Sequence, residues 1–205
     1  LAFARLKAKE ERVELFKYIA QLLNYPITQL PLHPIFNVIN GGAHANNKLD
    51  FQEFQVIPMV NDFGMAMALG REFYRKLGEL LENKFGKDQI SLGDEAGYSA
   101  PFESNEEAIE IMAELIAQKG YPMRIGLDTA ASQFFKRKGE GGKEKDYYLI
   151  EGKEYSVEEL LDKYLKLIDA YDILSIEDPF CEDDFVSFAA LMDKLNKEII
   201  SDKSA

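Results

Sequence analysis

The stretch LSIEDPF, at residues 174–180, ends a short apolar run on two acids and a proline. Continuous apolar runs of this length are typical of strands that are buried on both faces of a parallel sheet. Glu177 and Asp178 stand where such a strand would end. An acid at this position either meets solvent or belongs to a site that uses its charge.

Two other apolar runs end in the same way. MRIGLD ends on Asp128, at residues 123–128, and EIISD ends on Asp202, at residues 198–202. In a parallel barrel the carboxyl ends of all strands lie on one face, so Asp128, Glu177 and Asp202 would converge there. Their mutual repulsion would be relieved by a hard divalent cation with oxygen ligands, such as Mg²⁺. The alternative is that each strand simply ends in solvent.

Short apolar runs alternate with helical patterns along most of the chain. This alternation predicts an α/β fold with parallel strands and helices outside them. The predicted strands are 35–39, 51–58, 89–92, 123–128, 173–178 and 198–202, and the predicted helices are 5–23, 64–85, 104–119, 156–170 and 184–196. Capping boxes at Ser104 and Ser156 begin two of these helices, and Gly120 ends one. Residues 136–146 are predicted to be an exposed charged loop, and residues 147–155, YYLIEGKEY, a strand and a turn.

Composition excludes several classes of protein. The 205 residues carry 36 acids against 24 Lys and Arg, a net charge of −12, and no basic stripe that would bind nucleic acid. No apolar run approaches the ~20 residues needed to cross a bilayer. The single cysteine, Cys181, suits a reducing compartment, so a cytoplasmic location is expected. Residues 1–20 are charged throughout and lack an initiator Met, which indicates a segment of a longer protein.

Three more residues are candidates for chemistry. Glu53, in LDFQEFQ, and Glu95, in LGDEAG, lie near predicted strand ends, where a carboxyl with a tuned pKa can act as a general acid or orient water. His44 lies in the glycine-flanked loop GGAHANN, which could close on a ligand. The alternatives are surface or capping acids and a solvated histidine.

Taken together, these motifs resemble the enolase family. NVINGGAHANNKLDFQEF (37–54) is similar to its Asn-Gly-Gly-x-His-Ala loop followed by Gln-Glu-Phe, and SLGDEAG is similar to its Gly-Asp-Glu-Gly-Gly turn. GLDTAASQFF resembles the strand with the family's first metal aspartate. LSIEDPFCEDD resembles the Ser-Ile-Glu-Asp-Pro signature. The matches follow the family order across nearly the whole chain.

The resemblance implies a hydro-lyase of glycolysis and gluconeogenesis that interconverts 2-phosphoglycerate and phosphoenolpyruvate with two Mg²⁺ ions per site. It assigns metal binding to Asp128, Glu177 and Asp202. Glu95 would be the general acid, assisted by Glu53, and substrate would contact His44, Gln52 and Glu53. The implied assembly is a homodimer, or an octamer of dimers, with a small-molecule substrate and no nucleic-acid or membrane partner.

The resemblance also implies a division of the chain. Residues 1–32 would be the last helix and linker of an N-terminal α+β domain, and residues 33–205 would be the first half of a TIM-like (β/α) barrel. The family's Lys base has no counterpart in these residues, and Lys203 stands where the family has a second Asp. An alternative therefore stays open, a non-catalytic enolase-like structural or interaction subunit.

Overall fold

The computed structural model describes residues 1–24, 33–45, 47–140 and 143–202, with the side chains of 138–145 and 196–202 left out. The chain divides into two units, Leu1–Leu32 and His33–Ala205. The first contains α1 (Ala2–Glu10) and α2 (Leu15–Leu22), which contact each other. One helix over 5–23 was predicted, and this is wrong because Arg12 takes a left-handed backbone (φ 56°) that ends α1.

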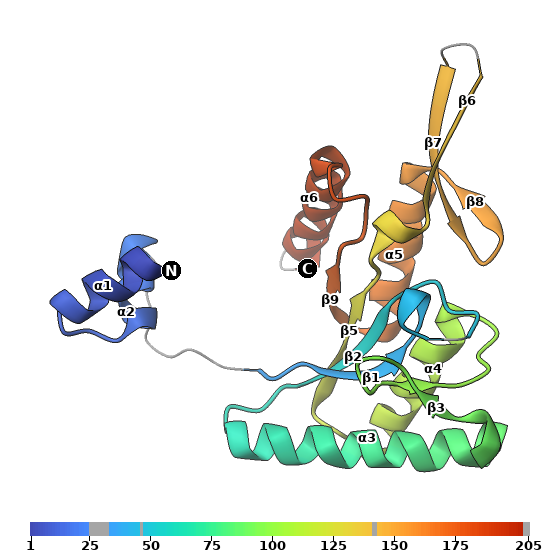
Figure 1. Cartoon of the computed structure of the whole chain (residues 1–205), viewed down its shortest axis with the longest axis horizontal. Helices are drawn as coiled ribbons and strands as arrows, with labels where there is room; N and C mark the ends of the chain where they lie inside the picture. The colour runs from blue at the N-terminus through green and yellow to red at the C-terminus, as the bar shows by residue number, and fades with distance from the viewer. Residues whose placement is uncertain (25–32, 46, 141–142, 203–205) are drawn as a thin grey trace. The chain divides into compact units, whose positions relative to one another are not determined.

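Over its described residues, the second unit contains two sheets, four helices longer than one turn and three short 3-10 turns (Figure 1). The strands are β1 (Phe36–Asn40), β2 (Glu53–Pro58), β3 (Ser91–Leu92), β4 (Tyr98–Ser99), β5 (Met123–Asp128), β6 (Phe135–Glu140), β7 (Lys143–Ile150), β8 (Lys153–Tyr155) and β9 (Ile173–Glu177). The helices are α3 (Phe63–Phe85), α4 (Asn105–Lys119), α5 (Val157–Tyr171) and α6 (Phe185–Asp202). The 3-10 turns are η1 (Gly42–His44), η2 (Lys87–Gln89) and η3 (Ala131–Gln133).

The larger sheet has the strand order β3-β4-β1-β2-β5-β9. β5 and β9 are parallel, whereas β2 is antiparallel to both β1 and β5. The prediction that all these strands are parallel is therefore wrong for β2, and also for β3, which is antiparallel to β4. Among the described residues between β1 and β2 the longest helical segment is η1, so β2 returns beside β1 in the opposite direction. As a result, one end of the strands carries the last residues of β1, β5 and β9 together with the first residue of β2.

The helices cover this sheet in chain order. α3 contacts β2, α4 contacts β5, α5 contacts β9, and α6 contacts α5. The predicted capping box of α5 is complete, because the Ser156 hydroxyl accepts from Glu159 N and the Glu159 carboxylate accepts from Ser156 N. At α4 only half of the predicted box is present: the Ser104 hydroxyl accepts from Glu107 N, whereas the Glu107 carboxylate accepts from Glu103 N. Gly120 ends α4 in the left-handed conformation, as predicted. These contacts bury one continuous hydrophobic core.

The smaller sheet, β6-β7-β8, replaces the loop predicted at residues 136–146. Phe135 pairs with Tyr148 at its base, and Tyr148 is fully buried against Phe134 and Phe180. Arg137 pairs with Asp146 across the two strands at 2.8 Å. Aromatic residues at the base anchor the hairpin, and opposite charges support it further out, so a charged sequence still forms strands.

The strand predicted at residues 198–202 is also absent from the described backbone, where these residues continue α6. No glycine or proline separates them from the preceding helical residues. A strand would need a neighbour in the sheet, and among the described residues β9 pairs on one side only, with β5. In the described ranges, no helix combines the length and the apolar stretch required to cross a bilayer.

Candidate active site

One row of paired residues crosses the sheet at the end where β1, β5 and β9 finish and β2 begins. Asn40 pairs with Glu53, Glu53 pairs with Asp128, and Asp128 pairs with Glu177. Directly paired residues on neighbouring strands project from the same face, with Cβ atoms about 5 Å apart. The antiparallel direction of β2 is what brings Glu53, at the start of a strand, into line with acids at the ends of β5 and β9.

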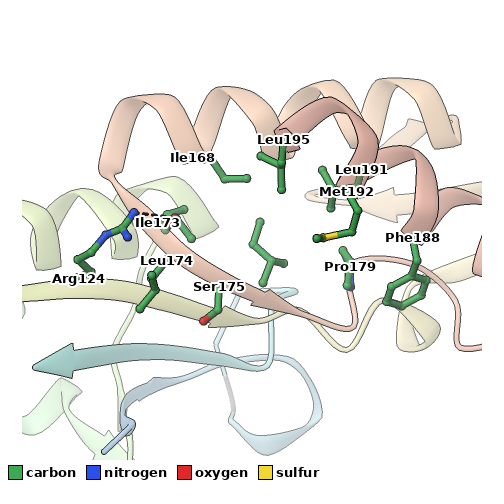
Figure 2. Close-up of a pocket in the computed structure, with 11 residues that line it drawn as sticks. Arg124, Ile168, Ile173, Leu174, Ser175, Pro179, Phe188, Leu191, Met192 and Leu195 are labelled. Atoms are coloured by element: carbon green, nitrogen blue, oxygen red, sulfur yellow. Dashed lines mark hydrogen bonds between the residues drawn. The ribbon is translucent and has the colours of Figure 1, made fainter. Parts of the chain in front are cut away.

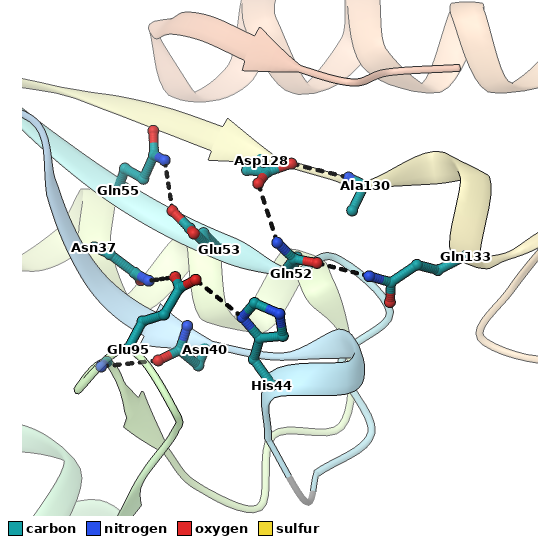
Figure 3. A network of polar contacts seen from close by, with 11 residues as sticks. Asn37, Asn40, His44, Gln52, Glu53, Gln55, Glu95, Asp128, Ala130 and Gln133 are labelled. Carbon is teal, nitrogen blue, oxygen red and sulfur yellow. Dashed lines mark hydrogen bonds and ion pairs between the residues drawn. The ribbon is translucent and has the colours of Figure 1, made fainter. Parts of the chain in front are cut away.

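Glu95 lies beside this row and contacts residues of both β1 and the η1 turn (Figure 3). Asn37 donates a hydrogen bond to its carboxylate at 2.9 Å, and His44 Nδ1 lies 3.3 Å from Glu95 Oε1. Gln55 donates to the Glu53 carboxylate at 2.8 Å. Two acids and three polar side chains from separate segments therefore converge at one place.

Glu53 and Glu95 behave as a pair of carboxyls that share a proton. Burial, followed by the hydrogen bond with Glu95, raises the pKa of Glu53 to about 7. The same hydrogen bond lowers the pKa of Glu95, and the neighbouring His44 and Asn37 lower it further. Below about pH 7 the proton therefore resides mainly on Glu53, while Glu95 is ionised.

The turn that carries Glu95 packs closely on β1. Gly97 donates its backbone N–H to Asn40 Oδ1 at 2.8 Å, and Asn40 is fully buried. A Cβ on Gly97 would lie 2.5 Å from that oxygen, and one on Gly93 would lie 2.6 Å from the Asn40 Cβ. Only glycine at both positions allows the turn to approach this closely and hold Glu95 over the sheet.

Asp128 is the most strongly held acid of the row. It accepts hydrogen bonds from Ala130 N at 3.0 Å and from Gln52 Nε2 at 3.3 Å, and Gln133 donates in turn to Gln52 at 2.7 Å. Burial, and then the negative charge of Glu177, raises the pKa of Asp128. The carboxylate is therefore oriented, yet its ionised form is destabilised by its surroundings.

Thr129 joins the two strand ends that carry Asp128 and Glu177. Its backbone N–H donates to the Glu177 carbonyl at 3.0 Å, and its hydroxyl donates to the Asp178 carbonyl at 2.6 Å. Because Thr129 is fully buried, these bonds are shielded from water. They fix the spacing of the two acids beyond the last residues of the strands.

The structure thus brings together five of the predicted site residues, His44, Gln52, Glu53, Glu95 and Asp128, and aligns Glu177 with them. The side chain of Asp202 lies outside the described residues, so its predicted role as a metal ligand stays a prediction. Among the described side chains, no group of three or more His, Cys, Asp or Glu could hold a metal ion.

Sequence reasoning missed Asn37, Asn40 and Thr129, which position the acids. Asn37 and Asn40 interrupt the apolar run IFNVIN, and a polar residue inside a buried strand is a signal that could have identified them. Thr129 gives no such signal, because a threonine after a strand is common. Asn37 Oδ1 and Asn40 Nδ2 are buried and have no hydrogen-bond partner among the described atoms.

Comparisons with known proteins identify the family. Residues 28–203 match the family described as "Enolase, C-terminal TIM barrel domain". The chain is 38% identical over 205 residues to the enolase of Methanocaldococcus jannaschii and 40% identical over 205 residues to that of Aeropyrum pernix. It is 39% identical over 204 residues to the enolase of Methanosarcina barkeri.

These alignments cover 98% of this chain and 45–46% of each relative, so the chain spans about half the length of the curated relatives that it matches. The family match covers most of the chain, and its TIM barrel description agrees with the partly formed barrel sheet. The motifs, the aligned acids and these comparisons together show that the chain belongs to the enolase family.

Proposed function

We propose that the protein carrying this chain is a hydro-lyase that interconverts 2-phosphoglycerate and phosphoenolpyruvate. The observation that carries this proposal is the row Glu53–Asp128–Glu177, with Glu95 placed against it. Dehydration of this substrate requires removal of a proton beside a carboxylate and protonation of a departing hydroxyl. Acids with separated pKa values, side by side at the mouth of a barrel, suit the second requirement.

A divalent cation fits the Asp128 and Glu177 end of the row, and we propose Mg²⁺. Both residues offer hard oxygen ligands from adjacent strands. Burial, and then the charge of Glu177, raises the pKa of Asp128, so its ionised form is destabilised, and a bound cation would offset this. Bound there, the ion would act as a Lewis acid on the charge that develops when the proton is removed. The assignment of Asp202 as a further ligand, and of a second ion, rests on the family resemblance.

The Glu53–Glu95 pair would supply the proton to the departing hydroxyl. Because the proton resides mainly on Glu53 and Glu95 is ionised, the two act as one unit whose apparent pKa values belong to the pair. We assign protonation of the departing hydroxyl to Glu95, which would first receive the proton that Glu53 holds. The base is expected, from the resemblance, outside residues 1–205.

His44 and Gln52 would contact the substrate. His44 belongs to η1 and lies against Glu95, and Gln52 bridges Asp128 and Gln133. The buried, unpartnered polar atoms of Asn37 and Asn40 support a ligand that carries several polar groups. The site gives no support to a purely structural role, since such a role does not require a proton-sharing acid pair.

The test uses the full-length protein that contains this chain. We expect phosphoenolpyruvate to form from 2-phosphoglycerate with added Mg²⁺ and to stop forming with a chelator. Glu95→Gln should lower kcat by about 10²–10⁴-fold, the usual contribution of a general acid. Glu114→Gln, at an exposed acid of α4, is the matched control and should leave the rate unchanged. A rate that survives Glu95→Gln contradicts the general-acid assignment.

The remaining expectations concern the whole protein. A homodimer or an octamer of dimers, and a cytoplasmic location, follow from the resemblance and from the single cysteine rather than from the site. Size-exclusion chromatography with light scattering on the full-length protein measures the first, and fractionation of the source cells measures the second.

A further inference from the structure

Three residues that have no part in the proposed chemistry form a closed ring of hydrogen bonds, which we call the Asp50–Asn105–Glu151 ring. Asn105 Oδ1 accepts from the backbone N–H groups of Asp50 and Phe51, both at 3.0 Å. The Asp50 carboxylate accepts from Glu151 N at 2.6 Å. The Glu151 carboxylate accepts from Asn105 N at 2.7 Å and from Asn105 Nδ2 at 3.0 Å.

The ring joins three segments that are distant in the sequence. Asp50 precedes β2, Asn105 is the first residue of α4, and Glu151 lies in the turn between β7 and β8. Asn105 is fully buried, so water does not compete for its amide, and the adjacent Phe51 is fully buried as well. The backbone that the ring holds leads directly into Gln52 and Glu53.

The backbone of Glu151 is an independent sign that its side chain is used. Ile150 pairs with Lys153, so Glu151 and Gly152 form a two-residue turn, with φ values of 52° and 73°. Such turns favour Asn, Asp or Gly at the first position, and a longer side chain there is strained. Glutamate is long enough to reach Asn105 from this turn, and its carboxylate is bound there twice.

We infer that Asn105 and Glu151 are positioning residues for Glu53. The ring fixes the backbone at Asp50 and Phe51, so that Glu53 enters β2 opposite Asp128 and within hydrogen-bonding reach of Glu95. This inference rests on the proposed function only for what Glu53 does once it is placed. According to this inference, the β7–β8 turn and the start of α4 help to set the geometry of the acids, although both are remote from them.

The experiment compares two changes at Glu151 in the full-length protein. Glu151→Asn suits the turn but is too short to reach Asn105, whereas Glu151→Gln keeps an acceptor of the same length. We expect Glu151→Asn to raise amide hydrogen exchange at Asp50 and Phe51 by about tenfold or more. We expect Glu151→Gln to restore most of the protection, which a merely structural role of the turn would not predict.

The rate is the second readout. In Glu151→Asn kcat should fall by about 10–100-fold, since small misplacements are costly, and in Glu151→Gln most of the rate should return. Asn105→Ala should reproduce the loss of protection and the fall in kcat. Ser104→Ala, which removes the cap of the same helix without touching the ring, is the control and should move neither readout.

The outcomes separate this inference from the proposed function. Unchanged exchange at Asp50 and Phe51 in Glu151→Asn overturns the inference, whatever the activity. If Asn105→Ala does not fold, the two Glu151 variants still decide it. If the full-length protein has no hydro-lyase activity, the proposed function fails, while loss of protection in Glu151→Asn and its return in Glu151→Gln still support the ring.

Discussion

Three of the four acids of the candidate site, Glu95, Asp128 and Glu177, are followed closely by a residue with left-handed backbone. Ala96 follows Glu95 (φ 62°), Ala130 lies two residues after Asp128 (φ 45°), and Asp178 follows Glu177 (φ 45°). None of the three is glycine, so each conformation costs about 1–2 kcal/mol. Strain of this kind persists where surrounding contacts impose it, and here those contacts set the direction of the acids.

Ala96 allows this strain to be measured. Its side chain is exposed, so Ala96→Gly removes no packing and relieves the positive φ. We expect a gain of about 0.5–1 kcal/mol in the free energy of unfolding, from urea denaturation. Ala117→Gly, at an exposed position of α4 with helical backbone, should instead lose about 1 kcal/mol. Equal losses at both positions would show that Ala96 is unstrained.

The raised pKa of Glu53 predicts a pH dependence of stability. An acid that binds its proton more tightly in the folded state than in the unfolded state stabilises the fold at low pH. This contribution is lost as pH rises from about 4.5 to about 7. Glu53→Gln should therefore reduce the pH dependence of the unfolding free energy over this range. At pH 8 the variant should be more stable than the unsubstituted protein by about 1 kcal/mol after allowance for solvent screening.

The measurement is urea denaturation in the presence of a chelator, at several pH values between 4.5 and 8. Asp128 and Glu95 are the acids that interact with Glu53. Glu114→Gln removes a negative charge at a distant position and therefore serves as the control for general charge effects. A Glu53→Gln protein whose stability keeps the wild-type pH dependence would show that Glu53 does not hold the shared proton.

At the scale of elements, α3 supports the turn that carries Glu95. Tyr74 of α3 donates a hydrogen bond to the Ala96 carbonyl at 2.5 Å and stacks on Tyr98, with ring centroids 4.5 Å apart. The helix approaches closely because Gly70 and Gly78 face the strands. A Cβ on Gly78 would lie 2.3 Å from the Tyr98 hydroxyl.

Gly70→Ala tests this close packing. A Cβ there would lie 2.2 Å from a ring atom of Phe36, so the ring or the helix would have to move. Overpacking costs roughly 1–3 kcal/mol, which exceeds the helix propensity gained by replacing glycine, about 1 kcal/mol. We expect a net loss of stability in thermal denaturation. A net gain would show that α3 has room to shift. Ala68→Gly, at an exposed position, should lose about 1 kcal/mol by propensity alone.

Local signals predicted most elements of the second unit. The capping serines and Gly120 fixed the limits of α4 and α5, because these signals act within one helical turn. Strand direction was not predictable in this way, since the return of β2 depends on which neighbour it meets. The β6–β7 hairpin was missed because its alternating charges are typical of a solvated loop, whereas the pairing of partly buried Phe135 with buried Tyr148 at its base stabilises the strands.

At the scale of the whole molecule, the acids of the candidate site could be predicted from the sequence, but their arrangement in space could not. Asp128 and Glu177 follow from strand ends alone, whereas Glu53 and Glu95 were singled out by short motifs. The row that aligns Glu53 with Asp128 requires the antiparallel register of β2, which no local pattern encodes. The family resemblance grouped Glu53 and Glu95 in one site with Asp128 and Glu177, but it did not predict the direction of β2. The match over residues 28–203 confirms the family.

The open side of the sheet carries an apolar groove of about 620 Å³ between β9, α5 and α6 (Figure 2). Leu174 and Ile176 of β9 line it together with Ile168 of α5 and Leu191 and Met192 of α6. Leu174 is 39% exposed, which is unusual for an apolar residue in a barrel strand. In a closed TIM barrel both faces of every strand are buried, by the interior on one side and by helices on the other.

Leu174→Lys therefore distinguishes the 205-residue chain from the full-length protein. In the chain alone the ammonium group reaches water, so the change should cost less than about 1 kcal/mol of unfolding free energy. In a closed barrel the same lysine would be buried, and the cost should rise to roughly 2–4 kcal/mol. Leu149→Lys, at a 37% exposed position of β7, should cost little in both proteins. Equally small effects of Leu174→Lys in both would mean that β9 stays at the edge of the sheet in the whole molecule.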